Sequence, residues 1–295
     1  MTAELFAIIA PVFICSALGF AWARLGYDFD VGFVTNIVTT VGTPCLILST
    51  LLKLQVSPVS FGEQAFAAFL VFALVSVTGA LLLRLLRLPY HSYLPALMFP
   101  NAGNMGLPLA LFAFGEEGLA LGIGYFTIAA CMQFTVGVGL AAGRASLGQL
   151  LRTPLIYAVL LGLAAMLLRL DTPKWISNTV NLIGGLTIPL MLVALGVSLA
   201  RLRVASLPRS VAFSCLRIAL GLLAALLIAE LLDLGPVQRG VLILQSAMPV
   251  AVFNYLFASR FKREPEEVAS MVLISTGLVF LGLPLLLLLV LPVPG

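Results

Sequence analysis

The sequence contains little charge and a single histidine. Charged residues make up 9% of its 295 positions, hydrophobic residues make up 61%, and the mean hydropathy is +1.15. Soluble domains carry about 25% charged residues. This composition excludes a soluble domain and predicts an all-α, polytopic integral membrane protein. The first apolar stretch lacks the basic region and cleavage site of a signal peptide, so we expect it to remain as the first membrane helix.

Several kinds of chemistry are excluded by what is missing. One histidine rules out a histidine-based metal site, and the four cysteines lie in different apolar segments without metal-ligand spacing. Motifs of nucleotide motors, metalloproteases and serine hydrolases are also missing. We therefore expect no enzyme activity, no catalytic residue, no metal and no cofactor. The modest net charge of +4 is spread over short loops and indicates membrane topology rather than nucleic-acid binding.

Ten membrane-spanning helices are predicted by cutting the sequence at charges and turn residues, because about 20 apolar residues cross a bilayer. They cover residues 3–23, 31–52, 63–86, 91–114, 118–142, 152–170, 174–200, 208–232, 236–259 and 266–291. Of the 16 basic residues, Arg217 lies inside a span, four lie in one set of alternate loops (Lys53, Arg169, Lys174 and Arg239), and the others lie in the opposite set. This bias predicts that the larger set is cytoplasmic and that both termini are extracytoplasmic.

Prolines mark an internal repeat. Pro44 and Pro189 lie in the second and seventh predicted spans, and Pro108 and Pro249 lie in the fourth and ninth. Both pairs have nearly the same separation, which predicts two repeats of five helices, residues 1–143 and 144–295. Because five is an odd number, the second repeat must be inverted in the membrane. Inverted repeats with broken, crossed helices are typical of secondary transporters.

The fourth and ninth predicted spans contain the strongest helix-breaking signals. These are Pro100, Gly103, Gly106 and Pro108 in one span, and Met248 and Pro249 in the other. Backbone groups freed at such breaks cannot face lipid. We expect Pro108 and Pro249 each to open the second half of a broken helix, so that two helix N-termini face each other and bind an anion. Two structural kinks without a ligand are the alternative.

Polar side chains near these breaks are the candidate substrate ligands: Asn101, Asn104, Gln133, Gln245, Ser246, Asn254, Thr43 and Ser49. Buried amides require hydrogen-bond partners, which could be the substrate or the freed backbone. Asn254 lies five residues beyond Pro249 and is expected to face away from the crossing. Gln133 could instead tie two helices together, and the hydroxyls of Thr43 and Ser49 could bond their own helix backbone.

The scarcity of charged residues in the predicted spans limits how transport could be coupled to an ion. Arg217 is expected to reach the cytoplasmic interface with its long side chain, or alternatively to neutralise a substrate carboxylate. No aspartate or glutamate lies at the middle of a predicted span, which excludes a carboxylate relay there. Coupling would then depend on carbonyls, amides, hydroxyls or peripheral carboxylates, and transport without a coupling ion is the alternative.

Two groups of residues resemble the auxin efflux carrier family. Pro100-Asn101, Met105-Gly106-Leu107-Pro108-Leu109 and Phe114-Gly115-Glu116 resemble its crossover signature, and Ala247-Met248-Pro249 with Phe257-Ala258 resembles its ninth helix. A short segment, Ala141 to Thr153, replaces the long central loop of the plant members, so the chain is similar to the short prokaryotic branch.

The resemblance implies a crossover fold shared with bile-acid symporters and sodium/proton antiporters. It also implies an organic-anion substrate, with small carboxylates such as malate or malonate transported by short members. It gives Gln133 a substrate or gating role and Glu116 a proton-linked supporting role. A bacterial inner-membrane location follows from the same branch, and a homodimer is suggested by analogy alone.

Together these features predict an elevator-type carrier of a small carboxylate. Predicted spans 3–5 and 8–10 would form a moving bundle, and spans 1, 2, 6 and 7 a scaffold. The partners would be the organic anion and the bilayer. An ion channel or membrane sensor without a carrier cycle is the alternative function.

Overall fold

The protein is helical throughout the part of the chain that the structure describes. The structure is a computed structural model and describes residues 2–53, 56–142, 153–168 and 172–291, with residues 148 and 170. The α-helices are α1 (Thr2–Arg24), α2 (Val31–Ile37), α3 (Thr43–Leu51), α4 (Pro58–Leu85), α5 (Tyr90–Met98), α6 (Leu107–Met132), α7 (Val138–Ala142), α9 (Pro154–Leu167), α10 (Lys174–Arg201), α11 (Leu207–Leu231), α12 (Pro236–Ser246), α13 (Val252–Phe261) and α14 (Pro265–Val290).

Seven of the described helical stretches are long and apolar enough to cross a membrane. They are Ala3–Arg24, Val31–Leu51, Pro58–Leu85, Ala102–Leu140, Lys174–Arg201, Leu207–Leu231 and Pro265–Val290. The predicted ten spans therefore do not all appear as separate long helices. Part of the sixth predicted span, with Arg152 and Arg169, lies outside the described residues, as does Arg144.

Three local features explain why ten predicted spans appear as seven long helical stretches. Gly115 has a φ of +67° and a ψ of −156°, a non-helical backbone conformation that favours glycine, so α6 consists of two helical stretches that meet at a kink there, between the fourth and fifth predicted spans. The sixth predicted span contains α9, which has 14 residues. The ninth predicted span is split into two short helices, α12 and α13.

Three short π-helical segments interrupt the α-helices, at Val38–Gly42, Ala102–Gly106 and Gln133–Gly137. The first two each end at a glycine two residues before a proline, Pro44 or Pro108. Proline has no N–H to donate to the carbonyl four residues earlier, so the regular α-helical pattern fails at that point. These two prolines therefore explain two of the three π segments.

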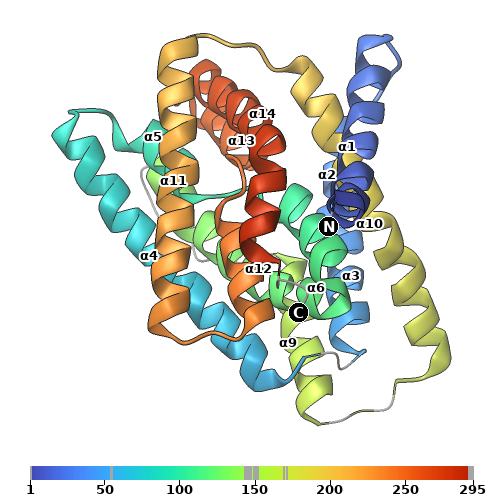
Figure 1. The fold of residues 1–295 in the computed structure, drawn as a ribbon. Coiled ribbons are helices and arrows are strands. Elements are labelled where there is room, and N and C mark those ends of the chain that lie inside the picture. The colour runs from blue at the N-terminus through green and yellow to red at the C-terminus, as the bar shows by residue number, and fades with distance from the viewer. Residues whose placement is uncertain are drawn as a thin grey trace.

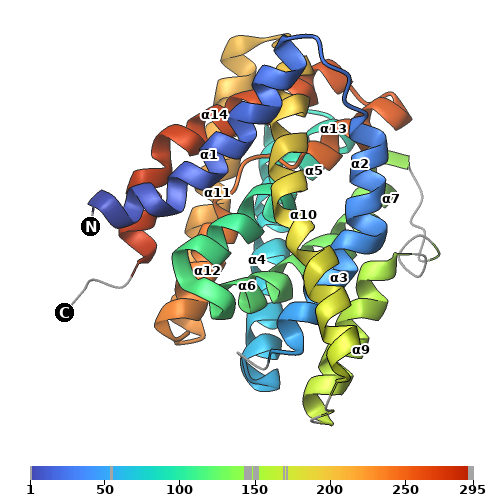
Figure 2. The ribbon, with the colours of Figure 1, turned by 90° about the vertical axis from the view of Figure 1, so that its right-hand side faces the viewer.

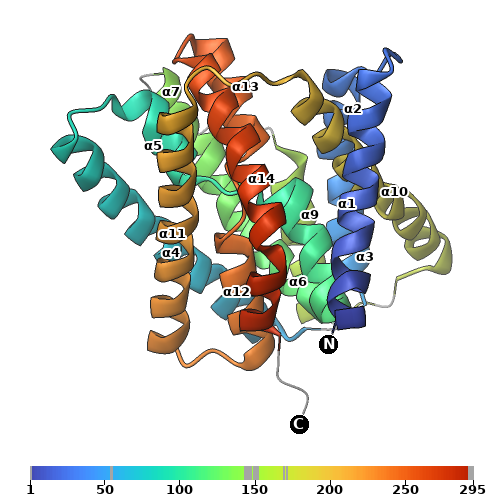
Figure 3. The same cartoon turned by 45° about the horizontal axis from the view of Figure 1, so that its top comes forward.

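The helices form two neighbouring groups. Helices α1, α2, α3 and α10 lie together on one side, α4, α5 and α11 lie on the other, and α6 and α12 lie between them (Figure 1). Helix α9 packs on α3, as the side view shows (Figure 2). The start of α1 and the end of α14 lie toward the same end of the molecule (Figure 3).

Helix α1 packs closely on α10 because both have glycine at the contact. A Cβ atom on Gly196 would overlap the carbonyl oxygen of Ser16, and one on Gly19 would overlap that of Val193. Side chains larger than hydrogen at these positions would separate the two helices. Glycine thus supplies the close backbone approach that small residues commonly give to membrane helices.

Candidate functional site

The two helix breaks are hydrogen-bonded to each other. The Asn101 N–H donates to the carbonyl of Pro249 over 2.7 Å, and the Ala251 N–H donates to the carbonyl of Phe99 over 3.1 Å. Together they form a short antiparallel bridge between Pro100 and Val250. Each break therefore satisfies backbone groups that the other break has freed, as a non-aqueous environment requires.

Two amides reinforce this contact. The Asn254 side-chain NH2 donates to the Phe99 carbonyl over 3.2 Å, and the Gln133 NH2 donates to the Asn254 side-chain oxygen, also over 3.2 Å. Asn254 is 3% exposed. The expectation that Asn254 faces away from the crossing is wrong, because the α13 helix begins later than predicted and its first turn directs this side chain to Phe99.

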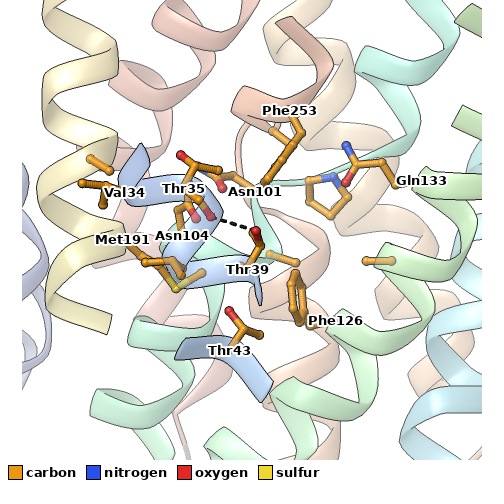
Figure 4. A pocket seen from close by; sticks show the side chains of 17 residues that line it. Val34, Thr35, Thr39, Thr43, Asn101, Asn104, Phe126, Gln133, Met191 and Phe253 are labelled. Atoms are coloured by element: carbon orange, nitrogen blue, oxygen red, sulfur yellow. Dashed lines mark hydrogen bonds between the residues drawn. The ribbon is translucent and has the colours of Figure 1, made fainter. Parts of the chain in front are cut away.

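A cavity lies beside the paired breaks and encloses about 580 Å³ of space, including its open mouth. It is lined by residues of α2, α3, α6, α10 and α13, of all three π segments and of the two breaks: Val34, Thr35, Val38, Thr39, Thr43, Pro100, Asn101, Ala102, Gly103, Asn104, Phe126, Ala129, Gln133, Met191, Ala194, Ala251 and Phe253. Figure 4 shows that Asn101, Asn104, Thr39 and Thr43 surround one space with Phe126 and Met191. We call it the crossing cavity.

Both second half-helices begin at the crossing cavity. One begins at Ala102, whose preceding residue Asn101 receives the first backbone hydrogen bonds from Met105 and Gly106. The other begins at Val252. Pro108 lies in the first turn of α6, as expected, although the helical backbone already begins with the π segment at Ala102. The expected start at Pro249 is wrong, because Pro249 lies in the break itself and α13 begins at Val252.

These helix starts give the cavity a positive character without a charged side chain. The first N–H groups of a helix lack partners within the helix and carry about half a positive charge in sum. Ala102, Gly103 and Asn104 line the cavity at one start, and Ala251 and Phe253 line it at the other. None of the described residues that line the crossing cavity is charged. Its electrostatic character therefore comes from backbone, amides and hydroxyls.

Two lining residues carry buried polar atoms without a partner. Among the residues that the structure describes, the Asn101 NH2 and the Thr43 hydroxyl have no hydrogen-bond partner, although these residues are only 4% and 2% exposed. A buried unsatisfied polar group costs about 1–3 kcal/mol. Such groups at a cavity are available to hydrogen-bond a guest, and the amide of Asn101 can donate to an anion.

The structure identifies lining residues that the sequence analysis missed, among them Thr35, Thr39, Phe126, Met191 and Phe253. Thr35 and Thr39 precede Thr43 at four-residue spacing, and this polar stripe on one helix face could have been found from the sequence. The Thr39 hydroxyl donates to the Thr35 carbonyl over 2.8 Å (Figure 4). Because π segments often occur at functional sites, their convergence on one cavity is informative.

Other predicted site residues lie outside the crossing cavity. Gln245 is completely buried against Gly106 and Gly122, and both its amide atoms lack hydrogen-bond partners in the described part of the chain. The Ser246 hydroxyl donates to that of Tyr125 over 3.2 Å. The remaining predicted positions also lie outside the lining: Asn254, Ser49, whose hydroxyl donates to the Leu46 carbonyl of its own helix, Gly106, Pro108, Met248 and Pro249.

The two predicted charges lie away from the cavity as well. Arg217 is 1% exposed and donates to the carbonyl of Ser246 over 3.2 Å. It therefore does not extend to an interface, because its guanidinium points into the protein. Glu116 forms an ion pair with Lys53 at 2.9 Å, and both side chains are about two-fifths exposed.

A second cavity continues from the first. It shares Thr35, Asn104, Ala194 and Phe253 with the crossing cavity and extends to Ser198 and Arg201 at the end of α10. It encloses about 750 Å³, including its open mouth. The two cavities together give the helix breaks a route to the end of the molecule that carries Arg201.

Comparison with known proteins agrees with a transport function. The sequence pattern of the family described as membrane transport protein matches residues 140–287. An uncharacterized transporter, MJ1031, from Methanocaldococcus jannaschii is 28% identical over 199 residues, 61% of each chain. An uncharacterized transporter from Methanothermobacter thermautotrophicus is 25% identical over 94% of this chain and 95% of its own length. This chain is therefore an integral membrane protein of the membrane transport protein family, which is the auxin efflux carrier family, and it is a transporter, not an enzyme.

Proposed function

We propose that the protein is a secondary carrier of a small organic anion, with the carboxylate bound in the crossing cavity. The observation that supports this most strongly is that both helix breaks open a helix at this one cavity, at Ala102 and Val252. Facing helix N-termini are a ready anion site. The unpartnered Asn101 amide would complete the site, and the apolar walls of Phe126 and Met191 would cover the rest of the substrate.

We also propose an inverted five-plus-five repeat with an elevator motion. The hydrogen-bonded breaks support a crossing of the fourth and ninth predicted spans. The extensive contacts of α1 with α10 and of α3 with α9 and α10 support the predicted scaffold, and those among α4, α6, α11, α12 and α14 support the moving bundle. The second cavity leads to Arg201, on the predicted cytoplasmic side, so this conformation would be open inward.

The Asn101→Ala substitution tests the binding site. The protein would be reconstituted into liposomes, and uptake of labelled lactate, malonate and malate would be measured with and without unlabelled anion inside. Losing a hydrogen bond to a charged group costs about 1.5–3 kcal/mol, so half-saturating concentrations should rise about tenfold to a hundredfold. Asn178→Ala, at an exposed position of α10, is the matched control.

Undiminished, saturable uptake in Asn101→Ala would contradict the site. The same assay separates the carrier from a channel or sensor. A carrier accelerates labelled uptake when unlabelled anion is present on the opposite side, whereas a channel gives flux without such acceleration and a sensor gives none.

A further inference from the structure

Arg217 is a charge in the interior that the proposed binding site does not use. Among the residues the structure describes, it is the one buried residue with a charged side chain. It lies on α11, 1% exposed, and it lines neither the crossing cavity nor the second cavity. Intramembrane charges are costly and usually functional, so its surroundings are informative.

The contacts of Arg217 attach it to the broken helix α12. Its Nη2 atom donates to the carbonyl of Ser246, the last residue of α12 before the break. Gly221, about one turn further along α11, allows this close approach, because a Cβ atom there would overlap the Ser246 carbonyl oxygen. The Ser246 hydroxyl in turn donates to Tyr125 of α6. Arg217 is thereby linked to both broken helices of the proposed moving bundle.

The protein supplies only a partial counter-charge to Arg217. No carboxylate forms an ion pair with it within the described part of the chain, and its Nε and Nη1 atoms have no hydrogen-bond partner. The C-terminal end of α12 carries about half a negative charge. The empty bundle therefore holds an incompletely compensated positive charge next to the break that leads to the anion site.

We propose that Arg217 compensates the charge of the transported anion. This proposal rests on the proposed carrier function. If the bundle moves as one body, Arg217 and a bound monoanion travel together, and the loaded bundle displaces no net charge across the membrane. The empty bundle displaces one positive charge. Helix dipoles do not change the net charge that the bundle displaces, because a dipole has no net charge.

This arrangement separates two kinds of transport by their response to voltage. Exchange of anion for anion uses only loaded crossings and should not respond to membrane potential. Net uptake requires the bundle to return across the membrane without an anion, so its rate should respond strongly to membrane potential. One charge that crosses the whole field changes the equilibrium accumulation by up to about fiftyfold per 100 mV. Removing the charge at position 217 should make exchange voltage-dependent, because the loaded bundle then carries the anion's charge alone.

The experiment uses proteoliposomes clamped at 0 or −100 mV by potassium and valinomycin, with labelled lactate as the monoanion. The wild-type exchange rate should change less than twofold between the two potentials, and exchange by Arg217→Met should change several-fold. Arg217→Lys should restore the wild-type behaviour, because it restores the charge. Arg209→Met, at a half-exposed position of the same helix, is the matched control and should behave as wild type.

Voltage-dependent exchange in the wild type, or voltage-independent exchange in Arg217→Met, would overturn the proposal. The wild-type measurement tests the proposal even if Arg217→Met does not fold. A failure of the wild type to exchange lactate, malonate or malate at all would instead overturn the proposed carrier function. The two failures are therefore distinguishable.

Discussion

At the scale of single residues, polar groups around the breaks divide into two sets. Gln133 donates to Asn254, and Asn254 donates to the Phe99 carbonyl, so this pair of amides stabilises the paired breaks. Asn101 and Thr43 line the cavity, and each has a buried polar atom without a hydrogen-bond partner among the described residues, so we propose that they bind a ligand. The first set should affect stability when changed, and the second should affect binding.

The Asn254→Leu substitution tests the first set. Leucine has the same branching at Cγ but cannot donate to Phe99 or accept from Gln133, and each buried polar group left unsatisfied costs about 1–3 kcal/mol. We expect a lower thermal unfolding midpoint in detergent, measured by tryptophan or thiol-dye fluorescence. Asn178→Leu should leave the midpoint unchanged. An unchanged midpoint in Asn254→Leu would show that these bonds do not stabilise the crossing.

The sequence predicted several residues of the cavity, but it did not predict which polar residues near the breaks are buried away from the cavity. Asn101, Asn104, Gln133, Thr43, Pro100 and Gly103 line it, and their types and positions in the break were visible in the sequence. Gln245 is a polar residue next to a break as well, yet it is buried against Gly106 and Gly122. Its direction depends on the rotation of α12, which only packing determines.

At the scale of elements, prolines predicted where helices are disturbed but not where they restart. Pro44 and Pro108 each follow a π segment, so the second half-helix begins several residues before Pro108. Pro249 lies in the break, where its carbonyl accepts from Asn101. The missing N–H of a proline disturbs the helical hydrogen bonds on its N-terminal side. The residue at which the helix begins again depends on contacts with the opposite break.

The contact between α1 and α10 gives a prediction at this scale. Gly196→Ala should force the helices apart, because its Cβ atom would overlap the Ser16 carbonyl oxygen. Overpacking typically costs about 1–3 kcal/mol. We expect a lower unfolding midpoint for this variant in the same fluorescence assay. Gly185→Ala on the same helix is the control, because no atom lies within 4 Å of the added Cβ. Equal midpoints for the two variants would contradict close packing at Gly196.

At the scale of the whole molecule, composition alone predicted an all-α membrane protein, and the family match agrees with it. The number of separate long helices could not be predicted. Gly115 joins two helical stretches of α6 through a kink with non-helical backbone angles, and the ninth predicted span is divided at its break. Hydropathy reports the length of apolar sequence and does not report where a backbone bends inside it.

The central claim at this scale is that a bundle carrying the crossing cavity moves past a scaffold. Lys53, just after α3 in the proposed scaffold, pairs with Glu116 of α6 in the proposed bundle. Arg239 pairs with Glu230 at 2.8 Å, and both lie within the proposed bundle. These two ion pairs offer matched positions for cross-linking, one between the groups and one inside a group.

Cysteine pairs at these positions, in a variant lacking the four native cysteines, would be joined by a short bifunctional thiol reagent. Anion exchange would then be measured in proteoliposomes. The account predicts that cross-linking Lys53→Cys/Glu116→Cys abolishes exchange and that a thiol-cleavable linker restores it on reduction, whereas cross-linking Glu230→Cys/Arg239→Cys leaves exchange intact. Full exchange with positions 53 and 116 joined would contradict the motion of the bundle against the scaffold.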